Sequence, residues 1–100
     1  MPSLREKKRY LAFEVESEKK LDSKEAQTLI ENSLKRFVGE LGMAKAGIIF
    51  MKDWKNNRGI IKVNTKSVDE LKASIALIKD ITIKSLTLSG SIEKVRSQCF

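Results

Sequence analysis

Apolar and polar side chains alternate along residues 10–16, and this period of two predicts a half-buried strand. One face of the strand would carry Leu11, Phe13 and Val15. The opposite face would carry Tyr10, Ala12 and Glu14. Residues 1–9, before the strand, show no apolar period and carry more basic than acidic side chains. We therefore expect a flexible basic arm at residues 1–9.

A helical period begins at Asp22, which with Glu25 fits a capping box. Gly39 and Gly42 bracket the expected end of this helix, where a left-handed residue commonly closes the last turn. The apolar stripe that would face the sheet consists of Ala26, Ile30, Leu34, Phe37, Val38 and Leu41.

Residues 46–51 read as a second strand, apolar on both parities, and residues 58–64 as a third. The polar residues 52–57 between them predict a loop and hence an antiparallel hairpin. Trp54 lies in this loop. It would either stack on a base or a partner, or pack on its own hairpin.

The second helix is predicted to begin at Ser67, which forms a capping box with Glu70. Its apolar stripe would consist of Val68, Leu71, Ile75 and Ile78. In a fourth strand, which ends at Gly90, Leu86 and Leu88 would face the helices. Ser85 and Thr87 would occupy the opposite face. Residues 91–99 predict a short last helix with Ile92, Val95 and Cys99 on one side.

The predicted order is β-α-β-β-α-β followed by a helix. This order is typical of an α+β, RRM-like or ferredoxin-like two-layer sandwich, with a four-stranded antiparallel sheet and an extra C-terminal helix. We expect one such domain over residues 10–100. Its open sheet face would carry an apolar patch that the last helix and a partner protein cover together. The candidates for this protein contact are Ile48, Phe50, Ile60, Ile92 and Val95.

Charge adds a nucleic-acid hypothesis. The chain has 20 basic and 13 acidic residues, a net charge of +7, and residues 52–66 contribute +4 of it. This excess favours a polyanionic partner, nucleic acid or an anionic membrane surface, and no apolar run approaches a membrane span. An RNA-recognition motif stacks bases on aromatic side chains of its first and third strands, but here only Tyr10 could do so. We therefore expect phosphate and shape contacts. The candidate residues are Arg5, Lys7, Lys8, Arg9, Lys55, Arg58 and Lys62.

Catalysis by the chain alone is not expected. It contains no histidine and a single cysteine, Cys99, so neither an internal disulfide nor a thiolate metal cluster can form. We expect Cys99 to act as a small apolar contact, and the alternative is a reactive thiol. The acidic residues show no spacing typical of a metal or acid–base site. Residues 17–20 lack the glycine and arginine that an acylphosphatase-like anion loop would need.

Five segments together resemble the family of archaeal ribonuclease P protein component 2, which is related to a eukaryotic subunit shared by ribonucleases P and MRP. They are LREKKRY at 4–10, GELG at 39–42 with AG at 46–47, RGIIKVN at 58–64, VDELKASIALI at 68–78 and LTLSGSIEK at 86–94. The resemblance runs nearly end to end. One departure is Leu88-Ser89, where the family more usually has Gly and Val.

The resemblance implies a non-catalytic subunit of the ribonucleoprotein that removes the 5′ leader from precursor tRNA. The N-terminal residues lack the apolar segment of a secretory signal, so we expect a cytoplasmic location. The RNA subunit, with magnesium ions, would perform the hydrolysis, and this chain would bind no cofactor. Implied partners are ribonuclease P RNA, other ribonuclease P proteins and protein component 3, a TIM-barrel-like protein, in a heterotetramer of two copies each. Precursor tRNA is a further candidate contact. The competing hypotheses are a stand-alone RNA-binding module and a ligand-sensing or acylphosphatase-like domain.

Overall fold

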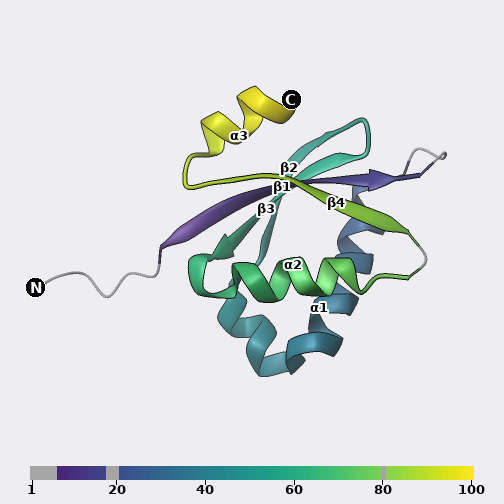
Figure 1. Ribbon diagram of the computed structural model, residues 1–100, viewed down its shortest axis with the longest axis vertical. Coiled ribbons are helices and arrows are strands. Elements are labelled where there is room, and N and C mark those ends of the chain that lie inside the picture. The colour runs from purple at the N-terminus through teal and green to yellow at the C-terminus, as the bar shows by residue number, and fades with distance from the viewer. Residues whose placement is uncertain (1–6, 18–20, 80) are drawn as a thin grey trace, which may run out of the picture.

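The computed structural model describes residues 7–17, 21–79 and 81–100 (Figure 1). Its elements follow the predicted order. They are β1 (Lys8–Glu16), α1 (Ser23–Ala46), β2 (Ile49–Lys55), β3 (Arg58–Asn64), a 3-10 turn (Thr65–Ser67), α2 (Val68–Ala76), β4 (Thr82–Ser89) and α3 (Ile92–Cys99). The first strand begins at Lys8, two residues earlier than predicted. Residues 1–6 of the predicted arm lie outside the described residues.

The four strands form one antiparallel sheet in the order β2-β3-β1-β4. The helices α1 and α2 cover one face of this sheet, and α3 crosses the opposite face (Figure 1). The predicted α+β sandwich with an added C-terminal helix is therefore confirmed. The sheet is covered on both sides, so its central strands lie between two apolar layers.

The alternation in β1 sorts its side chains into two cores. Leu11, Phe13 and Val15 belong to the first core, which lies between the sheet and the pair α1 and α2. Ala12 belongs to the second core, where it packs with Ile60 and Val95 beneath α3. These three side chains are at most 1% exposed. The second core therefore joins α3 to the middle of the sheet.

The hairpin between β2 and β3 is tighter than predicted. Asn56 and Asn57 have φ of 52° and 59°, the left-handed pair of a two-residue hairpin turn that asparagine tolerates well. Because two residues suffice for the turn, β2 extends to Lys55, and the predicted loop at 52–57 is wrong. The predicted strand at 46–51 began too early, since residue 46 still belongs to α1.

Helix α1 bends at Gly39 instead of ending there. Gly39 has φ 76° and ψ 174°, and helical structure resumes as far as Ala46, where Gly47 closes it with φ 60°. Phe37 and Leu41 flank the bend and are 47% and 74% exposed, so their predicted place in the buried stripe is wrong. A helix that changes direction no longer keeps one stripe on one surface.

Two smaller predictions are also corrected. The side chains of Asp22 and Ser67 precede α1 and α2 but make no capping hydrogen bond, so neither capping box forms. In β4 the register shifts: Thr87 pairs with Ala12, Ser85 pairs with Phe13, and Leu86 is the extra residue of a bulge. Ser85 therefore lies on the helix-facing side, contrary to prediction.

Of the two leucines of β4 that were expected to face the helices, Leu86 is the bulged residue, whereas Leu88 pairs with Leu11 of the first core and lies on the predicted side. Leu86 and Leu88 are each 38% exposed, and Ile83 is the β4 side chain that enters the first core. The alternation of side chains along a strand predicts which face of the sheet each one occupies only while the strand pairing is regular. One extra residue exchanges the two faces on one side of the bulge.

Helix α3 is fastened by polar contacts around its apolar centre. Arg96 donates two hydrogen bonds to the carboxylate of Asp53 on β2, at 2.9 and 3.1 Å. Thr87 on β4 donates to Gln98 Oε1 at 3.0 Å, and Arg58 on β3 donates to the Cys99 carbonyl at 3.4 Å. These contacts reach three strands, so they fix the direction in which α3 crosses the sheet.

The docking of α3 can be tested with V95A. Removing the two methyl groups of a fully buried side chain should lower the free energy of unfolding by about 1–3 kcal/mol, measured by urea denaturation. L77A is the matched control, because Leu77 is 59% exposed and its truncation should cost less than about 0.5 kcal/mol. Equal costs for the two variants would show that α3 does not pack on the sheet.

A second test concerns the close approach at Gly59. A Cβ atom there would lie 2.7 Å from Phe13 Cζ and 3.0 Å from Trp54 Cε3, so the buried Phe13 ring and the partly buried Trp54 ring would both have to move. We expect G59A to lower stability by about 1–3 kcal/mol. In the control G90A the nearest atom, at 2.9 Å, is Arg9 Nη1, the far end of a flexible side chain. Indistinguishable urea midpoints for G59A and G90A would contradict this packing.

Candidate nucleic-acid interface

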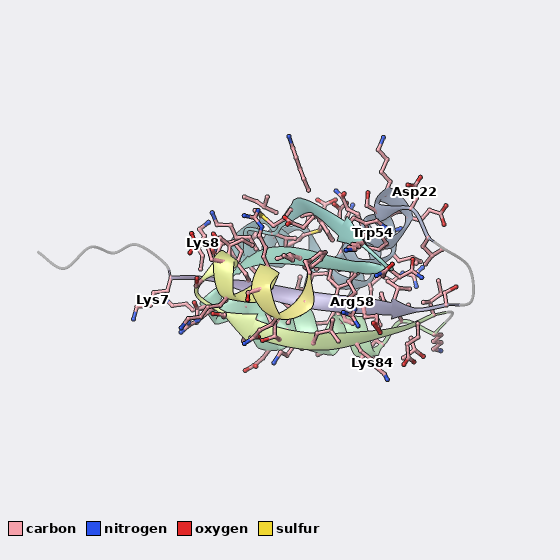
Figure 2. The ribbon with its side chains drawn as sticks, turned by 90° about the horizontal axis from the view of Figure 1, so that it is seen from above. Lys7, Lys8, Asp22, Trp54, Arg58 and Lys84 are labelled. Atoms are coloured by element: carbon pink, nitrogen blue, oxygen red, sulfur yellow. The ribbon has the colours of Figure 1, made fainter. Side chains whose placement is uncertain are left out.

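The described basic candidates occupy two ends of the sheet (Figure 2). Lys7, Lys8 and Arg9 lie at the start of β1, and Lys62 on β3 pairs with Tyr10 near the same end. Lys55 and Arg58 flank the hairpin turn at the other end. Lys62 lies four positions after Arg58 on β3, which is about 13 Å along the strand. The strands therefore place these cations at the two ends of the sheet instead of gathering them into one pocket. Arg5 lies outside the described residues.

Three of these cations are available to a phosphate. Lys7, Lys8 and Lys55 are exposed, and none of them forms a side-chain ion pair with any residue that the structure describes. Exposed lysines are mobile point charges that bind a phosphate without a fixed geometry. Such residues support affinity and salt sensitivity more than sequence readout.

The other three have contacts within the chain. Arg58 donates to Glu14 Oε1 at 2.9 Å and to the Cys99 carbonyl, so it joins β1, β3 and α3. Lys62 places its ammonium 6.0 Å from the centre of the Tyr10 ring, within reach of a cation–π contact. Arg9 lies against Gly90. Arg58 in particular has a structural role that the sequence pattern did not indicate.

Two further lysines are well placed and were not among the predicted candidates. Lys24 in the first turn of α1 and Lys52 on β2 are both exposed and line one hollow together with Trp54. No local pattern marks them, because the first belongs to a helix start and the second was assigned to a loop. Only the fold brings them together.

Acidic residues near the strands are engaged with cations. The Lys84 ammonium lies 2.5 Å from Glu16 Oε1, and this hydrogen bond raises the pKa of Lys84 above its ordinary value. A raised lysine pKa stabilises the fold at neutral pH, and that contribution is lost only as the pH rises through the raised value. The hydrogen bonds from Arg96 to Asp53 likewise raise the pKa of Arg96. Both cations stay charged in any physiological buffer.

The predicted protein-contact residues turn out to lie mainly inside the molecule. Ile60 and Val95 are 1% and 0% exposed, so they offer no surface while α3 is docked. Ile92 is partly buried in the same second core. Ile48 and Phe50 are partly buried against the first core, beneath α1, and not on the open face where the patch was expected. Phe50 pairs with Ile61, a side chain of the first core, and this register places Phe50 on the helix-facing side of the sheet.

Trp54 and Cys99 are both packed against the chain itself. The indole nitrogen of Trp54 donates to the Leu21 carbonyl at 3.1 Å, and its ring lies 6.1 Å from that of Phe13. Trp54 therefore packs on its own hairpin and core, one of its two predicted states. Cys99 is half-buried and packs against the second core, which agrees with the small apolar contact.

Two further findings concern the whole of the described chain. Across residues 7–17, 21–79 and 81–100, no three acidic or cysteine side chains group in a way that could hold a metal ion. In the same residues, none of the helices combines the length and the apolar character that crossing a membrane requires.

Comparison with known proteins identifies the family. Residues 9–100 match the Rpp14/Pop5 family. A ribonuclease P protein component 2 from Pyrococcus furiosus is 39% identical over 101 residues, which cover 95% of this chain and 84% of that protein. One from Methanococcus maripaludis is 33% identical over 102 residues, covering 97% and 78%.

A solved structure agrees with the fold. A chain in the cryo-EM structure of yeast ribonuclease MRP has a TM-score of 0.70 with this one at 19% identity, and the match covers 98% of this chain and 94% of that chain. At this identity the likeness shows a shared fold. The resemblance predicted from the five sequence segments is confirmed, and the chain belongs to the Rpp14/Pop5 family.

Proposed function

We propose that this chain is a non-catalytic protein subunit of ribonuclease P that assists the catalytic RNA in removing the 5′ leader from precursor tRNA. The observation that carries this proposal is the match of residues 9–100 to the Rpp14/Pop5 family, with relatives named ribonuclease P protein component 2 along almost the whole chain. The distribution of exposed lysines agrees with such a role, because it provides cationic surface that can lie against RNA phosphates.

The mechanism that we infer is electrostatic. Folded RNA brings phosphates close together, and their repulsion must be offset by magnesium or by protein cations. Lys7, Lys8 and Lys55 are exposed at opposite ends of the sheet and can each approach a different RNA segment. The chain would thereby hold the catalytic RNA in its active fold at lower magnesium concentration. The magnesium ions that take part in hydrolysis would belong to the RNA.

The proposed partners follow the family. They are ribonuclease P RNA, other ribonuclease P proteins and the TIM-barrel-like protein component 3, in a cytoplasmic complex with two copies each of components 2 and 3. Precursor tRNA is a further candidate. Among the described residues, exposed apolar side chains that could contact protein include Phe37 and Leu41 on α1, Leu77 directly after α2 and Ile49 on β2. They are better placed for this purpose than the buried Ile60 and Val95.

Charge reversal tests the RNA contacts. We expect the double variant K8E/K55E to slow precursor tRNA cleavage by the reconstituted holoenzyme at limiting magnesium, with recovery as magnesium is raised. The physical reason is that two exposed cations become anions facing phosphates. The salt dependence of RNA binding should also weaken, by about one unit of log–log slope for each lost phosphate contact.

The matched control is K72E, which reverses an exposed lysine on α2 away from the sheet ends. If holoenzymes reconstituted with K8E/K55E and with K72E cleave precursor tRNA at equal rates at limiting magnesium, the proposed RNA-contact surface is wrong. The proposed function has its own test, which is co-purification from the native cell. Failure of the wild-type chain to bring down ribonuclease P RNA would overturn it.

A further inference from the structure

A hollow of about 210 Å³ lies between the first turns of α1 and the hairpin of β2 and β3. Lys24 lies on its helical side, and Lys52, Trp54 and Gly59 lie on its strand side. Drug-sized ligands generally occupy larger cavities, so this hollow suits one planar ring or one nucleotide base. None of the residues proposed above for RNA contact lines it.

An irregularity in the sheet creates the hollow. Phe50 pairs with Ile61 and Trp54 pairs with Gly59, so residues 51–53 of β2 stand opposite a single residue of β3. The surplus residues must arch away from the ladder, and such bulges commonly redirect side chains next to binding sites. Phe50 and Trp54, the paired residues at the two ends of this irregularity, both line the hollow.

Trp54 is held in place before any ligand arrives. Its indole nitrogen donates to the Leu21 carbonyl, its ring packs on Phe13, and the missing Cβ of Gly59 allows this close approach. Side chains that are already ordered lose little conformational entropy on binding. An aromatic surface of this kind accepts any nucleobase, because every base has a π-face.

The rim of the hollow is positive. Lys24 and Lys52, the two lysines of its lining, are both exposed. The lining contains one acidic residue, Asp53, and both oxygens of its carboxylate accept hydrogen bonds from Arg96 on α3. That pairing neutralises the local negative charge and leaves the lysines to attract an anion. Aromatic rings beside lysines are the usual surface for single-stranded nucleic acid.

We propose that this hollow binds one unpaired nucleotide of RNA, with its base against Phe50 and Trp54 and its phosphates on Lys24 and Lys52. The proposal rests on the proposed function in taking RNA as the ligand, and it adds the class of RNA element that the chain recognises. A base inside a duplex is stacked on both faces and could not enter, so the site selects single-stranded or bulged RNA.

Trp54 is the only tryptophan of the chain, so its fluorescence reports directly on the hollow. The whole chain is titrated with a short single-stranded oligoribonucleotide and with a duplex of the same length. We expect saturable quenching by the single strand and none by the duplex. Binding to each RNA is followed in parallel by the anisotropy of a labelled RNA end.

The double variant K24A/K52A should weaken single-strand binding roughly 25-fold at about 0.1 M salt. The reason is that each phosphate contact contributes to the binding constant a factor equal to the molar salt concentration raised to the power of about −0.7. The control K72A/K79A removes two exposed lysines, one on α2 and one shortly after it, that do not line the hollow, and it should leave the affinity unchanged. F50L keeps an apolar side chain but removes one aromatic face, and should weaken binding while circular dichroism shows an intact fold.

The possible failures are distinguishable. If labelled RNA binds but the Trp54 fluorescence does not change, or if K24A/K52A binds like K72A/K79A, the hollow is not the site and the proposed function stands. If the duplex quenches Trp54 as the single strand does, recognition of an unpaired nucleotide is wrong. If a ribonuclease P protein quenches Trp54 and RNA does not, the hollow is a protein socket and the proposal is overturned. Absence of all RNA binding, together with failed co-purification, would overturn the proposed function itself.

Discussion

The packing of Val95 against Ala12 and Ile60 is the contact on which the architecture depends. A four-stranded sheet whose central strands are apolar on both faces needs a cover on each side. The helices α1 and α2 provide one cover, and the eight-residue α3 provides the other through a small, fully buried centre. The paired hydrogen bonds between Arg96 and Asp53 then fix its direction. An ion pair this exposed contributes little stability by itself, so the apolar centre holds α3 in place and the ion pair orients it.

This cover determines where RNA can bind. RRM-like sheets that bind single strands leave the face with their stacking side chains open. Here α3 covers that face, where Ala12 and Ile60 are buried and Tyr10 is partly buried against them. Arg58 is engaged with Glu14 and the Cys99 carbonyl. The cations that remain exposed lie at the ends of the sheet and around the hairpin. The aromatic side chain best placed for a base is Trp54, which lies on the helix-facing side of β2. The centre of the sheet is therefore buried and serves the packing of the fold, whereas the exposed cations that could bind RNA lie at its margins.

Much of the fold could be predicted from the sequence because its strongest signals are periodic. The alternation of Leu11, Phe13 and Val15 identified the first core, and β3 was placed at its observed bounds. The failures have local causes that a period does not contain. A bulge at Leu86 reverses the parity of β4, and Gly39 bends α1 without ending it. Asn56 and Asn57 make a turn from two residues where a loop of six was expected. The basic surface was predicted in kind, but the ion pair of Arg58 and the pairing of Lys24 with Lys52 in one hollow depend on tertiary contacts.

The most direct measurement is an NMR titration of the isotope-labelled chain with single-stranded RNA, following each backbone amide. If the sheet face is closed and RNA binds at its margins, signals from Lys24 and from the hairpin around Lys52 and Lys55 should move. Signals from Ala12, Ile60 and Val95 should stay where they are. Large shifts at Ala12, Ile60 and Val95, with loss of the helical signature of α3, would show instead that RNA displaces the helix and binds the sheet.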